Sequence, residues 1–183
     1  MDMNGEIDRV LTFWFETLEP KDWFMKSDKV DADIKAGFRG VYDDAIKGGC
    51  DSWQASPDGI LALIILLDQF PRNMFRDTAG MYQSDEQAMS VARHAIETGL
   101  DRQVADDRRI FVYLPFEHSE SLDDQNLCYD LVATLSDESY LPYAEAHRRI
   151  IKRFGRFPHR NALLGRESTP EEIEFLKEEG SSF

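Results

Sequence analysis

Residues 60–67 read ILALIILL, the one strongly apolar run in the chain. The run is less than half the length of a membrane-spanning helix, so it belongs inside a folded protein. Ser56 fits a helix cap, Pro57 fits the first helical position, and the pair Phe70-Pro71 is a typical stop signal. We therefore expect a helix from Pro57 to Phe70 that is apolar on nearly every side and lies in the middle of the fold.

Apolar residues keep helical spacing on both sides of this run. Helices are expected over residues 7–18, 30–47, 57–70, 84–98, 107–114, 121–135 and 139–154, and from Thr169 onward. No run alternates as a strand would, and no linker rich in proline or serine divides the chain. The sequence therefore predicts one all-α domain over residues 1–183, with about eight helices in antiparallel hairpins.

Several helix boundaries depend on particular residues. Ser84 and Gln87 fit a capping box at the start of a helix. Pro115 is expected to end the helix before it, because proline lacks the N–H that continues a helix. Gly155 is expected to end another helix in the left-handed conformation, and residues 169–172 fit a second capping box.

The composition excludes several classes of partner. The chain has 35 acidic and 21 basic residues, and its formal net charge is −14. We expect neither nucleic acid nor a membrane as a partner, because anionic phosphates are bound by basic surfaces. The N-terminal residues show no secretory signal, so a cytoplasmic location is expected. Cys50 and Cys128 match no metal or redox spacing and are expected to be free thiols.

Basic residues are concentrated near the end of this acidic chain. Seven of the 21 lie between His147 and Arg166, a span without aspartate or glutamate. One interpretation is an internal network, in which these arginines pair with acids such as Asp68 and Glu120 and lock helices together. The other is an anion site, in which the basic side chains face a carboxylate or phosphate ligand. The sequence leaves both interpretations open.

The sequence FPRN at residues 70–73 resembles FPHRN at residues 157–161. The likeness fits two uses of one stop signal, because a residue before proline is pushed out of the helical region. It also fits two related corners that converge on one pocket. In that second case the residues expected to bind the anion are Arg72, Asn73, Arg156, His159, Arg160 and Asn161.

A second candidate site lies in the stretch LPFEHSES, residues 114–121, in a break between two expected helices. His118 or His159 could act as a general acid or base there, with Glu117 or Glu120 as its partner. This arrangement would make the protein a hydrolase-like enzyme. The histidine spacing matches no compact metal-ligand motif, so a metal site is a minor alternative and no cofactor is expected.

Five stretches together resemble one bacterial family, domain of unknown function 924. They are FWF (13–15), LALIILLDQFPRNMFR (61–76), YLPFEHSE (113–120), HRRIIKRFGRFPHRN (147–161) and LGRESTPEE (164–172). The resemblance implies an all-helical fold similar to tetratricopeptide-like superhelices, and it implies no reaction. A binding module for an anionic small molecule or a peptide carboxylate is therefore the first hypothesis, and the enzyme is the alternative.

Overall fold

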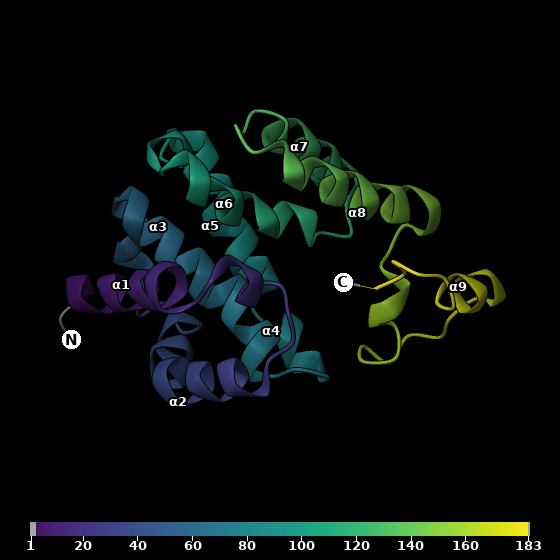
Figure 1. Cartoon of the computed structure of the whole chain (residues 1–183), viewed down its shortest axis with the longest axis horizontal. Helices are drawn as coiled ribbons and strands as arrows, with labels where there is room; N and C mark the ends of the chain where they lie inside the picture. The colour runs from purple at the N-terminus through teal and green to yellow at the C-terminus, as the bar shows by residue number, and fades with distance from the viewer. Residues whose placement is uncertain (1–2, 183) are drawn as a thin grey trace.

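The computed structural model describes residues 3–182, and every regular element in that range is helical, as predicted (Figure 1). The α-helices are α1 (Met3–Thr12), α2 (Asp28–Ala45), α3 (Pro57–Ile64), α4 (Phe70–Met74), α5 (Asp85–Thr98), α6 (Asp106–Glu117), α7 (Leu122–Val132), α8 (Leu141–Phe154) and α9 (Pro170–Phe175). Short π and 3-10 turns lie between them. Within residues 3–182, no helix combines the length and the apolar character needed to cross a membrane. The tetratricopeptide-like arrangement stays a prediction.

The apolar run forms the centre of the fold, as expected. α3, a π turn at Ile65–Gln69 and α4 follow one another as a continuous helical rod. Every residue from Gly59 to Pro71 is buried. α1, α5 and α6 pack against α3, and α2 packs against α4, so the rod is covered along its length (Figure 1). Burial on all sides explains why this segment is apolar at successive positions rather than along one stripe.

The predicted helix end at Phe70-Pro71 is wrong, because the chain stays helical as far as Met74. Proline lacks an N–H, and its ring clashes with the carbonyl one turn earlier in a regular α-helix. The π turn at Ile65–Gln69 widens the rod just before Pro71. The hydroxyl of Ser84 donates a hydrogen bond of 2.6 Å to the carbonyl of Leu67, four residues before the proline. The wider turn and this hydroxyl together accommodate Pro71.

The predicted capping box at Ser84 and Gln87 is also wrong. The Ser84 hydroxyl bonds to the Leu67 carbonyl in the core, and the Gln87 side chain donates to the carbonyl of Ile46. α6 likewise runs through Pro115 to Glu117. Its last carbonyls are satisfied by Gln125, whose Nε2 donates to three of the backbone oxygens at and after the helix end. A side chain from the following helix therefore sets the end of α6.

The C-terminal part of the chain has a small apolar core of its own. Ile150 and Ile151 in α8 and Phe157 after it are buried together with Phe175 of α9. Gly155 ends α8 in the left-handed conformation, and the capping box at residues 169–172 begins α9, as predicted. Figure 1 shows α9 beyond the end of α8, and the chain returning from α9 toward the body of the molecule. This segment carries the FPHRN corner.

The contact between Ser84 and Leu67 is testable by mutation. Ser84→Ala should lower the free energy of unfolding by about 1–3 kcal/mol, because it removes a buried hydroxyl that bonds to the Leu67 carbonyl and to the Tyr42 hydroxyl. Ser90→Ala, an exposed serine of α5, serves as the control. Urea unfolding followed by circular dichroism measures both. Equal stabilities of the two variants would contradict this account of Pro71.

Candidate functional site

Two arginines from distant parts of the chain meet at Asp85, the first residue of α5. Arg72 of α4 donates two hydrogen bonds to the Asp85 carboxylate, at 3.0 and 3.3 Å. Arg160, in the 3-10 turn Pro158–Arg160, brings Nη1 to 3.9 Å from the same carboxylate. Both guanidinium groups also lie over the ring of Tyr82, at 5.9 and 4.8 Å from its centroid. The FPRN and FPHRN corners therefore converge on one place.

Arg160 has few polar contacts for a charged group that is only 7% exposed. Its guanidinium lies over the rings of Phe157 and Tyr82, at 4.4 and 4.8 Å from their centroids. Its Nε is buried and has no hydrogen-bond partner among residues 3–182. Burial and the nearby charge of Arg72 lower its pKa. A guanidinium in such surroundings has lost its hydration without full replacement.

Next to the two arginines, Asp68 binds a histidine. Asp68 is fully buried at the end of the apolar run, and its Oδ1 lies 2.8 Å from Nδ1 of His118 and 3.3 Å from Nη1 of Arg72. Burial alone would raise the pKa of Asp68, but the charge of Arg72 and the His118 contact outweigh it and lower the pKa. Asp68 is therefore ionised, and it fixes the orientation of the His118 ring.

We call the set of side chains that these contacts join the Arg160 cluster. Its members are Asp68, Arg72, Tyr82, Asp85, His118 and Arg160. Sequence reasoning placed Arg72, His118 and Arg160 in a site and gave Asp68 only as a possible arginine partner. It did not find Tyr82 or Asp85. No local signal marks those two residues, since only the packing of α5 against the central rod brings them to the arginines.

Glu117 and His147 form a second buried contact beside the cluster. Oε1 of Glu117 lies 3.4 Å from Nδ1 of His147, which is also 2.9 Å from the carbonyl oxygen of Tyr143. Burial, together with the charge of Asp68, raises the pKa of Glu117 to about 8. Burial also lowers the pKa of His147 to about 3. At pH 7 both groups are neutral, so this contact is not an ion pair.

The structure gives His118 a different partner from the two acids expected. Glu117 and His118 are neighbours at the end of α6, but Glu117 contacts His147 whereas His118 contacts Asp68. Glu120 accepts two hydrogen bonds from Arg166, at 2.6 and 2.9 Å, and one from the backbone N–H of Phe157. It therefore holds the FPHRN corner in place.

His159 belongs to the FPHRN corner and lies beside Phe157 and Arg160. Its ring centroid is 5.6 Å from that of Phe157. Burial and the charge of Arg160 lower the pKa of His159 to about 4. A hydrogen bond with the backbone of Ser181 favours the charged form and opposes this shift, but it is the smaller effect. His159 is therefore neutral at pH 7.

Other candidate residues belong to the framework. Arg156 donates two hydrogen bonds to Glu172, at 2.7 and 2.8 Å, and together with other contacts this lowers the pKa of Glu172 to about 2. Asn161 donates to Ser168 and Glu172. Asn73 donates to Asp31 of α2 at 2.8 Å. Most arginines of the basic segment thus form the internal network, whereas the buried Arg160 has its nearest carboxylate at 3.9 Å.

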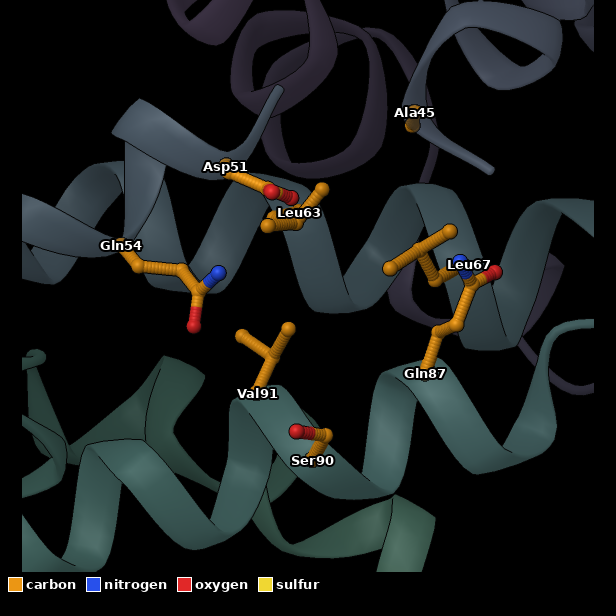
Figure 2. Close-up of a pocket in the computed structure, with 8 residues that line it drawn as sticks. All are labelled: Ala45, Asp51, Gln54, Leu63, Leu67, Gln87, Ser90 and Val91. Carbon is orange, nitrogen blue, oxygen red and sulfur yellow. The ribbon is translucent and has the colours of Figure 1, made fainter. Parts of the chain in front are cut away.

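Two hollows in the surface of the described residues lie away from the Arg160 cluster. Figure 2 shows one of about 220 Å³ near α3 and α5, lined by Ala45, Asp51, Gln54, Leu63, Leu67, Gln87, Ser90 and Val91. A second, of about 370 Å³, is lined by Tyr129, Glu138, Leu141, Pro142 and Glu145. Neither hollow is lined by a member of the Arg160 cluster. Among the described residues, no three His, Cys, Asp or Glu side chains are grouped closely enough to hold a metal ion.

The buried carboxyl of Glu117 predicts a dependence of stability on pH. The pKa of Glu117 is raised in the folded chain, so between about pH 4.5 and 8 Glu117 is ionised in the unfolded chain but protonated in the folded one. The wild type therefore loses stability as the pH rises through this range. Glu117→Gln removes this loss. Its advantage should grow by up to about 1.4 kcal/mol per pH unit across that window, as measured by urea unfolding. The exposed Glu97→Gln is the control, and a pH-independent difference for Glu117→Gln would refute the assignment.

Comparison with known proteins gives a family and a related fold. The family model for a bacterial protein of unknown function, DUF924, matches residues 10–180. A solved structure, the protein of unknown function ATU0120 from Agrobacterium tumefaciens, is 43% identical, covers 96% of this chain and 99% of its own, and superposes with a TM-score of 0.92. Among curated proteins, none matches this chain. The chain therefore belongs to the bacterial DUF924 family.

Proposed function

We propose that this protein binds a small anion, a carboxylate or a phosphate, at the Arg160 cluster. The observation that carries the proposal is the guanidinium of Arg160, which is buried, lies 3.9 Å from its nearest carboxylate, and has a buried Nε without a partner among the described residues. An incoming anion would supply the charge-assisted hydrogen bonds that the protein does not.

The surrounding contacts support this role over a purely structural one. Asp85 already accepts two hydrogen bonds from Arg72, so its hydrogen bonds do not depend on Arg160. By contrast, Arg156 and Arg166 are each bonded twice to a carboxylate. A buried charge without such bonds lowers stability, and binding sites are where proteins retain groups of that kind.

Two matched substitutions test whether Arg160 is structural. Arg72→Met should lower the free energy of unfolding by about 3–5 kcal/mol, because it removes the shared cation between Asp68 and Asp85. Arg160→Met should change it by less than about 1 kcal/mol, because no carboxylate loses a hydrogen bond. Urea unfolding of the unliganded proteins gives both values. A loss from Arg160→Met as large as that from Arg72→Met would make Arg160 a structural residue.

Ligand-dependent melting tests the binding itself. Benzoate or inorganic phosphate, at matched ionic strength, should raise the melting temperature of the wild type, whereas neutral benzamide should not. At about 100 times the dissociation constant the gain is about 2.7 kcal/mol, or roughly 5–10 °C for a chain of this size. Arg160→Gln should abolish the shift. Arg153→Gln, an exposed arginine that pairs with Glu171, should retain it.

The two ligands separate the two kinds of anion. A shift with benzoate alone assigns the site to carboxylates, and a shift with phosphate alone assigns it to phosphates. The proposal fails if neither anion stabilises the wild type, or if Arg160→Gln responds as the wild type does.

A further inference from the structure

Resting on the proposed function, we infer that the bound anion is a substrate: a small carboxylic acid that carries an ester group, which His118 hydrolyses as a general base. The inference depends on the position of His118 within the Arg160 cluster. Its side chain is 16% exposed, and its ring is held by a carboxylate that also contacts Arg72.

The contacts form a connected series from the base to the anion-binding arginine. His118 bonds to Asp68, Asp68 faces Arg72, and Arg72 shares Asp85 with Arg160. The base and Arg160 therefore lie in one cluster but are separated by intervening side chains. A ligand that reaches both needs its charge at one end and its reactive bond some distance away.

The contact with Asp68 sets the chemistry of the His118 ring. The ionised carboxylate accepts a hydrogen bond from Nδ1, which leaves Nε2 as the basic nitrogen. Nε2 forms no hydrogen bond within the described residues. It is also not one of the fully buried polar atoms without a partner, so a water molecule can reach it. A carboxylate that orients a histidine while its other nitrogen remains free is the arrangement of a general base. Asp68 is accordingly a positioning residue.

The charges around His118 favour a monoanion. Arg72 and Arg160 are balanced by Asp68 and Asp85, and His118 itself is neutral because burial and Arg72 lower its pKa. A carboxylate adds one negative charge to this buried group of side chains, whereas a phosphate dianion adds two. The cost of desolvating charge makes the carboxylate the better fit.

The reaction needs only water as a second reactant. Nε2 of His118 takes a proton from water as its oxygen attacks the ester carbonyl carbon. The tetrahedral intermediate then collapses and the bond to the alcohol oxygen breaks. The proton held on Nε2 passes to the departing alkoxide, so the products are a carboxylic acid and an alcohol, and His118 returns to its neutral form.

The test compares hydrolysis of 4-acetoxybenzoate with that of its neutral analogue, 4-acetoxybenzamide, by chromatography of the phenolic product. The wild type should hydrolyse the anion faster than buffer, and with a kcat/KM at least about 10-fold above that for the amide. His118→Gln and His118→Asn should lower kcat by about 100-fold or more while KM changes little. Both variants should keep the wild-type melting shift with benzoate. Arg153→Gln should hydrolyse the ester at the wild-type rate.

The pH profile gives a readout that a structural histidine would not move. The rate should rise with pH as His118 loses its proton and then level off. The groups that face His118 are Asp68, Arg72, Asp85 and the neutral ring of His147, whose centroid is 6.5 Å away. Loss of this profile in His118→Gln supports the inference.

The two proposals fail in distinguishable ways. A wild type that is stabilised by benzoate but hydrolyses 4-acetoxybenzoate no faster than buffer overturns the inference and leaves anion binding intact. The same holds if the histidine variants keep the wild-type rate, or if the amide reacts as fast as the acid. A wild type that no anion stabilises overturns the proposed function, and the inference with it.

Discussion

Asp68 places an ionised carboxylate directly after the apolar run of the central rod, fully removed from solvent. A charge in that position costs several kcal/mol unless partners reach it, so the elements around it are constrained to supply them. α4 supplies Arg72 and the end of α6 supplies His118. Arg72 in turn binds Asp85 and so ties the start of α5 to the rod. The positions of these three helices are linked through one side chain.

The two Phe-Pro corners share more than a sequence likeness. In the first, Asn73 donates to Asp31, a carboxylate that also accepts two hydrogen bonds from Arg76. In the second, Asn161 donates to Glu172, which also accepts two from Arg156. Each corner thus uses its asparagine to anchor a carboxylate that an arginine clamps. The second arginine of each corner, Arg72 in the first and Arg160 in the second, belongs to the Arg160 cluster.

Much of the helical framework could be predicted because its signals are local. Gly155 and the capping box at Thr169 act within a few residues, and the structure confirms both. The helix ends at Pro71 and Pro115 could not be predicted in this way. In those places the backbone is supported by Ser84 and Gln125, which come from other helices.

The candidate site was likewise predictable only where its signals are local in the sequence. The segregation of basic residues in the sequence pointed to the part of the chain that carries Arg160. Which buried arginine would lack a carboxylate within hydrogen-bond distance depends on where acids such as Glu120 and Glu172 lie after folding. Tyr82 and Asp85 join the site only through tertiary packing, and no spacing in the sequence encodes that.

The small core of the C-terminal segment has a consequence for the energetics of the whole chain. Arg160 reaches Tyr82 and Asp85 only when this segment is docked, and four buried apolar residues form its own core. Segments that bury little apolar surface open at a lower free energy than the global fold. In the opened state Arg160 regains water, which favours opening further. Docking of the chain after Gly155 and occupancy of the proposed anion site would therefore be linked equilibria, so a ligand that binds only the docked state would slow exchange of the amides after Gly155.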